Sequence, residues 1–314
     1  MNWWQSVILG LVEGITEYLP VSSTGHLILA GQLLGLKDPK AKDAVDAFEI
    51  IVQGGAILAV VGLYWPRFVQ MLKGLLGKDP AGLKLLINIV IAFMPAAVIG
   101  LMIKKWINAH LFYATPVVFA MIVGGVYMIV VEAWRSGKLR RPKYSGAGKT
   151  IDDMTALDAL RIGFLQVISM WPGTSRSMMT ITGGYFAGLR PTAAAEFSFL
   201  LGVPTLLGAT VLALWHDYKD AHPKPGSGIA AQPMFYQVLG PVPVLIGLVV
   251  AAVSAAFAVK WLVGFLNRRG LTPFGVYRIL LGIAMIGLIV GRVLTIEPDV
   301  QAAPVKVSAV DSGK

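Results

Sequence analysis

Six long apolar runs constrain this chain more than any other feature. Each run is long enough to cross about 30 Å of hydrocarbon as a helix, which takes about 20 residues. The composition agrees, because 56% of the residues are hydrophobic and only 14% are charged, unlike a soluble protein. Long runs favour helices over a membrane β-barrel. We therefore predict an all-α polytopic membrane protein with six transmembrane helices, at Phe48–Trp65, Lys84–Ile103, Thr115–Trp134, Pro191–Trp215, Tyr236–Phe265 and Pro273–Leu294.

Charge and cysteine content exclude several other classes. The formal net charge is +10, but the basic residues lie in short loops between apolar runs, where lipid headgroups and membrane topology account for them. We therefore expect membrane lipids and no nucleic acid as partners. The absence of cysteine excludes a disulfide framework and a thiolate metal site, and we expect no organic cofactor. No cleaved signal peptide is expected, because Glu13 and Glu17 interrupt the first apolar stretch and no basic segment precedes it.

Two further apolar stretches, Trp3–Leu36 and Thr155–Leu189, are broken in the middle by proline and hydroxyl residues. The breaks read YLPVSSTGH around Pro20 and MWPGTSRS around Pro172. Each half is too short to span the hydrocarbon at 1.5 Å per residue. We therefore predict two re-entrant helix hairpins, whose non-helical tips must lie inside the protein or at a wet cavity.

The two hairpins are predicted to be copies of one another. Pro172 follows Pro20 by 152 residues, and AFEIIVQGGAILAVV from Ala47 parallels AEFSFLLGVPTLLGATV from Ala195. Three predicted spans separate the hairpins, so the hairpins would enter from opposite faces as an inverted-topology repeat. One transmembrane domain over 1–297 would then hold repeat one at about 3–110, repeat two at about 155–265 and a last helix at 273–294, followed by a disordered polar tail at 298–314.

The distribution of basic residues predicts the orientation. Cytoplasmic loops carry an excess of lysine and arginine, and one side of the predicted topology holds Arg67, Lys73, Lys78, Lys84, Arg135, Lys138, Arg140, Arg141, Lys143, Lys149, Arg190, Arg268 and Arg269. That side is therefore assigned to the cytoplasm. Both termini and the opening of the first hairpin would face the periplasm or cell exterior.

Glu13 and Glu17 lie four residues apart, so a helix would project both carboxylates from one face. Burying two carboxylates in an apolar environment is expensive, and such groups are functional by default. A cation site, a proton relay or acid/base catalysis would each explain them. The structural alternative is an ion pair with a buried arginine, such as Arg161 or Arg278, that only fixes packing.

The first break combines helix-capping hydroxyls with an imidazole. Ser22, Ser23 or Thr24 can cap the second half-helix, whose free N–H groups attract anions. His26 follows within the same half-helix, where it could serve as general acid, general base or nucleophile.

The second break places Arg176 among the hydroxyls of Thr174, Ser175 and Ser177. A guanidinium grips phosphate through bidentate hydrogen bonds, and these hydroxyls would help to bind it. The alternative is an ion pair with Glu13 or Glu17 that locks the two hairpins together, and both could hold at different stages. Four other intramembrane polar residues in the repeated segments are expected to support the site: Glu49, Gln53, Glu196 and Ser198. Of these, Gln53 is assigned to substrate binding.

This inventory suits phosphoryl transfer on a lipid. It suits an anion transporter or lipid flippase equally well, because inverted repeats with broken helices are also the plan of many transporters. The residues alone leave the two open.

The signatures resemble those of a known family, the integral-membrane undecaprenyl-diphosphatases, also called bacitracin-resistance proteins. EGITEYLPVSSTGH (13–26) is similar to the first family signature, and PGTSRSMMT (172–180) followed by EFSFLLGVP (196–204) is similar to the second. The resemblance runs from about residue 3 to about residue 294. The chain departs from the second signature at Met178 and Met179, where glycine and a small residue are usual.

The resemblance implies hydrolysis of undecaprenyl diphosphate to undecaprenyl phosphate, which recycles the lipid carrier for cell-wall synthesis and confers bacitracin resistance. A bacterial inner (cytoplasmic) membrane location, a polyprenyl diphosphate lipid as substrate and a possible homo-oligomer go with it. The essential residues would be Glu17, His26 and Arg176, with Glu13 in support and a phosphate pocket lined by Ser22, Ser23, Thr24, Thr174 and Ser175.

A divalent cation, Mg²⁺ or Ca²⁺, is part of the family's description. Glu13 and Glu17 are the natural ligands to test for it, because such hard cations prefer oxygen. For the chemical step, either Ser23 or a water activated by His26 would attack the terminal phosphorus.

Overall fold

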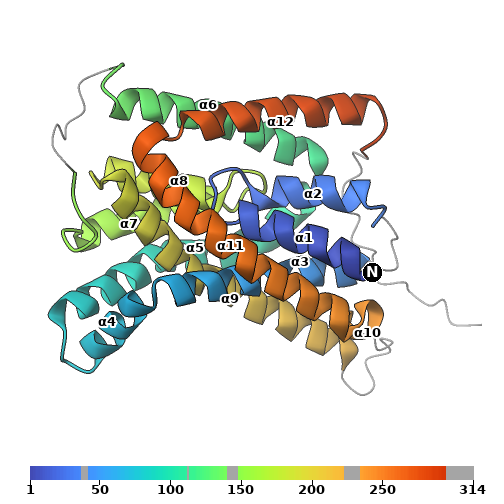
Figure 1. The fold of residues 1–314 in the computed structure, drawn as a ribbon, viewed down its shortest axis with the longest axis horizontal. Coiled ribbons are helices and arrows are strands. Elements are labelled where there is room, and N and C mark those ends of the chain that lie inside the picture. Colours follow the sequence, from blue (N-terminus) through green and yellow to red (C-terminus); the bar gives the residue numbers. More distant parts are fainter. Residues whose placement is uncertain (37–41, 112, 140–147, 223–233, 295–314) are drawn as a thin grey trace, which may run out of the picture.

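A computed structural model describes residues 1–36, 42–111, 113–139, 148–222 and 234–294, which form twelve helices and no strand beyond an isolated bridge between Lys149 and Leu189. The predicted disordered tail at 298–314, and the predicted cytoplasmic residues Arg140, Arg141 and Lys143, lie outside these residues. Figure 1 shows the helices packed into one body, with α6 and α12 side by side along one edge.

The six predicted membrane spans are confirmed. Six of the described helices are long and apolar enough to cross a membrane. They are α3 (Lys42–Leu63), α5 (Pro80–His110), α6 (Ala114–Arg135), α9 (Pro191–Ala221), α11 (Pro241–Arg269) and α12 (Thr272–Val290). Several extend beyond the predicted ends, since polar residues at a helix terminus continue the turn without belonging to the apolar run.

The predicted start of the fifth span was wrong. The prediction ran without interruption from Tyr236, but α10 (Phe235–Leu239) ends at Gly240, and α11 begins at Pro241. Gly240 has a φ of +82°, a left-handed conformation that glycine tolerates. Proline at the next position restricts the residue before it and cannot continue the hydrogen-bond ladder. The two residues together break the helix.

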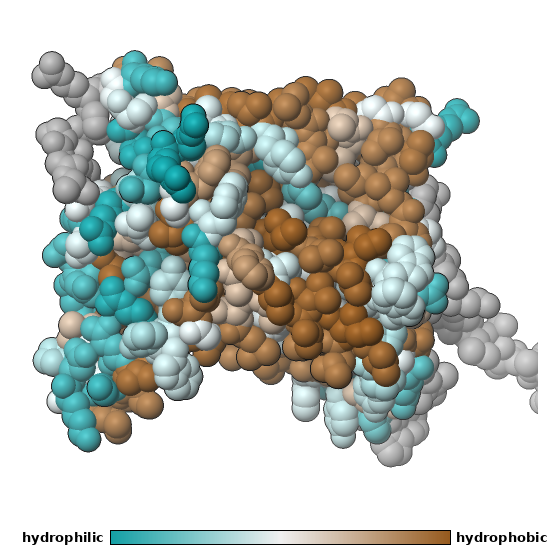
Figure 2. Space-filling model, in the orientation of Figure 1, coloured by the Kyte–Doolittle hydropathy of each residue, from teal (hydrophilic) through white to brown (hydrophobic). Residues whose placement is uncertain are grey.

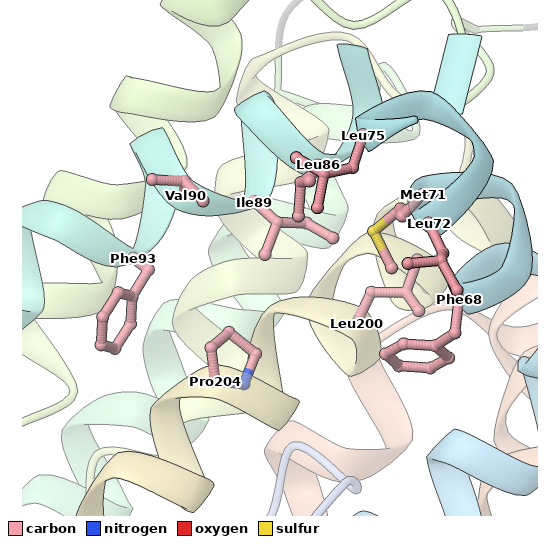
Figure 3. A pocket seen from close by; sticks show the side chains of 10 residues that line it. All are labelled: Phe68, Met71, Leu72, Leu75, Leu86, Ile89, Val90, Phe93, Leu200 and Pro204. Atoms are coloured by element: carbon pink, nitrogen blue, oxygen red, sulfur yellow. The ribbon is translucent and has the colours of Figure 1, made fainter. Parts of the chain in front are cut away.

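Helix α4 (Trp65–Leu75), which was not predicted, follows α3 after a turn at Tyr64. Arg67 of α4 pairs with Glu196 of α9, its Nε lying 2.7 Å from Oε1. A cavity of about 320 Å³ is lined by residues of α4, α5 and α9. Figure 3 shows its walls, which are entirely apolar: Phe68, Met71, Leu72, Leu75, Leu86, Ile89, Val90, Phe93, Leu200 and Pro204. Such a cavity suits a hydrocarbon chain and offers no group for acid/base chemistry.

Four short helices occupy the predicted hairpins, with breaks at the predicted positions. They are α1 (Trp3–Thr16), α2 (Ser23–Leu33), α7 (Ala156–Ile168) and α8 (Arg176–Phe186). The longest has 14 residues, so none reaches across about 30 Å of hydrocarbon at 1.5 Å per residue. In Figure 1, α1 and α2 come from the end of the molecule that holds the N-terminus, and α7 and α8 come from the other end.

Some of the helix contacts have the pattern expected of the predicted repeat. α1 packs on α11 and α7 packs on α5, which is the exchange expected if α1 corresponds to α7 and α5 to α11. α3 also packs on its counterpart α9, and α6 on α12. The repeat, the re-entrant hairpins and the side of the membrane from which each would enter stay predictions.

The surface has the polarity of a membrane-embedded protein. Figure 2 shows a broad hydrophobic area, with hydrophilic residues gathered at the end of the molecule where α4, α7 and the C-terminal end of α6 lie. Many large apolar side chains are exposed along the spans, such as Leu101, Met102, Phe257 and Leu280. Apolar exposure on this scale marks a surface that contacts lipid or another protein, and its place along the membrane spans favours lipid.

Helix α7 starts with a buried acidic cap, and this cap predicts a pH-dependent stability. Burial acts to raise the pKa of Asp158, but hydrogen bonds from Lys149 Nζ (2.8 Å) and from Thr155 outweigh burial and hold this pKa below its ordinary value. A depressed pKa adds stability at neutral pH that is lost as the pH falls through the folded-state value. Asp158→Asn should cost about 1 to 2 kcal/mol at pH 7, measured by thermal unfolding in detergent.

The cost should begin to shrink as the pH falls below about 4, the ordinary aspartate pKa, and should disappear only below the lower folded-state pKa, where the wild-type carboxyl is protonated as well. Asp153→Asn is the matched control, since Asp153 is an exposed residue that caps only Thr150. An equal loss of stability by Asp158→Asn at every pH would contradict this account.

Candidate active site

The two breaks have the same local structure. Ser22 and Ser175 are the N-caps of α2 and α8, with φ angles of +74° and +79°. Each side chain accepts a hydrogen bond from the N–H three residues on, at 3.4 Å for Gly25 and 3.3 Å for Met178. Left-handed serines are strained, and such strain persists only where the surrounding structure holds it. The remaining first-turn N–H groups have no acceptor within their own helix, which makes each break suitable for an anion.

Glu17 joins the two breaks. One carboxylate oxygen, Oε1, accepts a hydrogen bond from Arg176 Nη2 at 3.2 Å, and the other, Oε2, accepts one from Ser23 Oγ at 2.7 Å. Glu17 and Arg176 lie 159 residues apart in sequence, and both side chains are more than nine-tenths buried. Of the two interpretations of Arg176, the ion pair with Glu17 is the one seen in the structure.

Arg176 is held in place on several sides. Its Nη1 donates to the carbonyl of Ser198 at 3.0 Å, and its Cζ lies 5.4 Å from the centre of the Tyr18 ring. A Cβ at residue 202 would lie 2.7 Å from Nη1, so α9 can approach the guanidinium only because Gly202 has no side chain. The buried Nε has no hydrogen-bond partner among the described residues. The guanidinium therefore keeps a donor for a further ligand.

His26 faces Tyr277, which was not among the predicted site residues. Its Nδ1 lies 2.7 Å from the Ser22 carbonyl, and its Nε2 lies 2.7 Å from the Tyr277 hydroxyl on α12. A carbonyl can only accept, so Nδ1 carries the proton and the lone pair of a neutral ring lies on Nε2. The two rings are also nearly parallel, with an interplanar angle of 11°. Among the described residues, the hydrogen bonds of Glu17 go to Ser23 and Arg176 and not to His26.

Glu13 is fully buried, with 0% exposure, one helical turn before Glu17. Neither of its carboxylate oxygens has a hydrogen-bond partner among the described residues. An unpaired carboxyl at such depth is costly. Glu13 can therefore take up a proton or a cation, as the sequence predicted, without first breaking another contact.

The remaining predicted residues fall into two groups. Ser177 and Ser175 lie at the junction of the breaks, because Ser177 Oγ donates to the Leu19 carbonyl at 2.8 Å and lies 3.2 Å from Ser175 Oγ. Thr24 and Gln53 are half-buried, and neither side chain forms a hydrogen bond within the described residues, so their role in substrate binding stays a prediction. Met178 and Met179 are both buried inside the protein.

A second buried arginine also meets the breaks. Arg278 of α12 donates to the backbone carbonyls of Pro20, Gly173 and Thr174. Thr174 therefore contacts Arg278 through its carbonyl oxygen and not through the predicted hydroxyl. The structural alternative, in which Arg161 or Arg278 pairs with Glu13 or Glu17, is not what the structure shows. Arg161 is largely exposed and lies 3.8 Å from Asp158, at the start of its own helix. Arg278 could have been recognised as a site residue from the sequence, because it lies inside an apolar span, where a charged residue is functional by default.

The assembled site can bind and react with a phosphate group. It combines a buried guanidinium, the N-termini of two helices, a hydroxyl bonded to a carboxylate, and a histidine with a fixed tautomer. Cations and N–H groups stabilise the charge on a transferring phosphoryl group. The hydroxyl and its carboxylate have the contact that a nucleophile and its general base require. Their burial beside apolar spans suits a substrate that arrives from the lipid phase.

Comparison with known proteins agrees with this chemistry. An undecaprenyl-diphosphatase of Sorangium cellulosum is 44% identical over 288 residues, covering 92% of this chain and 87% of that protein. One from Janthinobacterium is 43% identical, with 89% and 92% covered, and undecaprenyl-diphosphatase 2 of Rhodospirillum rubrum is 43% identical, with 90% and 93% covered. Residues 6–284 match the family described as bacitracin resistance protein BacA. This multi-pass membrane protein therefore belongs to the BacA family of bacitracin resistance proteins.

Proposed function

We propose that the protein hydrolyses undecaprenyl diphosphate to undecaprenyl phosphate and inorganic phosphate, the activity named for its relatives. One observation carries the proposal: a single carboxylate, Glu17, bridges the guanidinium of one break and a hydroxyl of the other. That arrangement joins a phosphate-binding cation to a nucleophile and base pair. The same activity would recycle the lipid carrier for cell-wall synthesis and confer resistance to bacitracin.

Substrate binding comes first. The terminal phosphate oxygens would accept hydrogen bonds from the Arg176 N–H groups and from the first-turn N–H groups of α2 and α8. Since the phosphate carries more charge than a carboxylate, it would displace Glu17 from Arg176. Glu17 then keeps its bond to Ser23 and is free to accept the proton from that hydroxyl.

The chemical step follows from this geometry. Ser23 Oγ would attack the terminal phosphorus while Glu17 takes the hydroxyl proton, so the Oγ–P bond forms as the bond from phosphorus to the bridging oxygen breaks. Undecaprenyl phosphate leaves, and water then hydrolyses the phosphoserine to phosphate and restores Ser23. Direct attack by a water activated by His26 is the alternative. The 2.7 Å contact between Ser23 and Glu17 favours the serine route.

Glu13 and Glu17 fit a divalent cation, because the two Glu13 oxygens are buried without a partner among the described residues. The part of the chain that the structure describes contains no group of three histidine, aspartate or glutamate side chains placed to hold a metal. The chain would therefore supply one or two carboxylate ligands to Mg²⁺ or Ca²⁺, and substrate phosphate and water would supply the others. Such an ion would neutralise charge on the diphosphate.

The proposed location is the bacterial inner (cytoplasmic) membrane, with both termini and the pocket opening on the periplasmic side. The hydrophilic end in Figure 2 carries Arg67, Lys73 and Arg135 on α4 and α6, which supports its assignment to the cytoplasm. In Figure 1 the N-terminus and the last turn of α12 lie at the opposite end.

Phosphate release in detergent tests the proposed function. The purified protein should release phosphate from a polyprenyl diphosphate without any membrane gradient, and His26→Ala should lower the rate. A transporter or flippase would move the lipid across sealed vesicles and break no bond, so the absence of release from folded protein, with Mg²⁺ and Ca²⁺ supplied, would refute hydrolysis.

Tyr277 predicts a smaller kinetic effect of its own. Tyr277→Phe removes the hydroxyl that bonds to His26 Nε2 but keeps the ring, so kcat/KM should fall about 5- to 10-fold, since one such hydrogen bond contributes about 1 kcal/mol. The pH–rate profile should also change, because His26 loses its oriented partner. Tyr218→Phe, at an exposed position of α9, is the matched control. An unchanged rate and pH profile for Tyr277→Phe would show that the hydroxyl does not act on His26.

A further inference from the structure

Arg278 on α12 is a buried cation that the proposed chemistry does not use. Its side chain is fully buried, with 0% exposure. Within the described part of the chain it forms no ion pair, and its five hydrogen bonds all go to backbone carbonyl oxygens. An arginine inside a membrane helix that donates only to backbone carbonyl oxygens holds the segments that carry those carbonyls in fixed positions.

The guanidinium contacts corresponding positions in the two breaks. Nη1 lies 3.4 Å from the Pro20 carbonyl, and Nη2 lies 2.6 Å from the Gly173 carbonyl. Pro20 precedes the N-cap Ser22 by two residues, and Gly173 precedes the N-cap Ser175 by two residues. One planar group therefore holds the same carbonyl of each break, and Nη1 adds the Thr174 carbonyl at 2.9 Å.

The same guanidinium is anchored outside the breaks. Nε donates to the Met121 carbonyl at 3.1 Å, and Nη2 donates to the Ala120 carbonyl at 3.0 Å, both on α6. α6 and α12 pack along each other, so they form a rigid frame to which both breaks are attached.

Substrate binding makes this attachment necessary. The ion pair between Arg176 and Glu17 joins the two breaks in the structure, but on the proposed mechanism the substrate displaces it. Another connection must then keep Ser23 and Arg176 at the right separation. Arg278 and the hydrogen bond from Ser177 to Leu19 are connections that remain.

We propose that Arg278 is a positioning residue: it fixes the two breaks relative to each other and so aligns Ser23 with a phosphate held by Arg176. The proposal rests on the proposed function for its kinetic consequence but not for its structural one. Lysine cannot replace arginine here, because one ammonium group presents its donors at a single point and cannot span carbonyls on three segments.

Gly124 gives an independent way to disturb the same contact. A Cβ at residue 124 would lie 2.5 Å from Arg278 Nη2. Gly124→Ala should therefore displace the guanidinium while its charge remains. Gly208→Ala is the matched control, because no atom lies within 4 Å of a Cβ there and Gly208 also lies within a membrane helix.

Kinetics on the purified full chain provide the first test. Arg278→Lys should lower kcat 10- to 100-fold with KM within about 3-fold, since a misplacement of about 1 Å can cost about 100-fold in rate. Gly124→Ala should lower kcat in the same direction by about 3- to 10-fold. Arg135→Lys and Gly208→Ala should match the wild type. A purely stabilising role would instead lower the unfolding temperature and leave kcat per folded molecule unchanged, which would overturn the proposal.

A distance measurement provides a second test that needs no activity. The chain contains no cysteine, so Leu33→Cys on α2 and Phe186→Cys on α8 introduce its only thiols, both at exposed positions. The distribution of distances between nitroxide labels at these sites should broaden in Arg278→Lys and in Gly124→Ala.

The outcomes separate the two proposals. If the wild type releases no phosphate but the distances broaden, the proposed function fails and the positioning role stands. If Arg278→Lys keeps the wild-type kcat, its charge alone is sufficient and the positioning role is refuted. Should Arg278→Lys fail to fold, Gly124→Ala decides, and an unchanged rate with unchanged distances in that variant refutes the proposal.

Discussion

Replacing Arg176 with alanine is expected to reduce kcat/KM for a polyprenyl diphosphate by about 10³-fold or more. Removing a single donor to a developing oxyanion costs about 10² to 10³ in rate, and losing an arginine that stabilises a transferring phosphoryl group costs about 10³ to 10⁵. Arg176 would supply both the charge and several donors, and its Nε has no other partner among the described residues. Phosphate release from purified protein in detergent measures the effect.

Arg176→Lys should recover part of the loss, since it keeps the charge but not the bidentate geometry. Arg135→Ala is the matched control, because Arg135 also pairs with a glutamate, Glu132, at the end of its own helix. Removing Arg176 leaves Glu17 buried without its cation, so the unfolding temperature has to be measured beside the rate. Near-wild-type activity in folded Arg176→Ala would contradict the assignment of Arg176 to the phosphate.

Ser23→Ala is expected to reduce kcat by about 10³-fold and to abolish any covalent intermediate. The serine would form a bond to phosphorus, and no other hydroxyl among the described residues bonds to Glu17. Rapid quenching of the wild type with a substrate labelled in its terminal phosphate should trap label on the protein, and Ser23→Ala should trap none. Loss of a nucleophile cannot be compensated by binding groups.

Thr205→Ala is a suitable control, since the Thr205 hydroxyl lies in α9 and, among the residues that the structure describes, bonds only to the carbonyl of Leu201 in its own helix. Retention of most of the activity in Ser23→Ala, together with the absence of trapped label in the wild type, would refute the serine route. Water activated by His26 would then become the attacking group.

Much of the fold could be predicted from the sequence, because a membrane helix can be recognised from the hydrophobicity of its own residues. A span such as Thr115–Trp134 is defined by its own apolar side chains, and α6 follows it to within one residue at each end. The breaks at Pro20 and Pro172 were equally local, since proline and capping serines act within one turn. Helix α4 was missed because 11 residues with two basic side chains do not form an apolar run.

The site was predictable only where its chemistry lay in the two broken segments. Glu17, Ser23 and Arg176 stand in short motifs rich in polar groups, and polar groups at such depth need a function. Their pairing, however, joins residues 159 positions apart. Tyr277 and Arg278 stand in no comparable motif, and their partners His26 and Pro20 lie 251 and 258 positions away.

The sequence by itself therefore determined which segments cross the membrane, where two of them break, and which polar residues stand at the breaks. Hydrophobicity, proline and helix capping act within a few residues, so they can be interpreted without knowing the fold. Only the tertiary structure decided that Glu17 joins the two breaks, that Tyr277 faces His26, and that one guanidinium on α12 holds both breaks. Those contacts depend on how distant helices pack, and packing is a property of the whole chain.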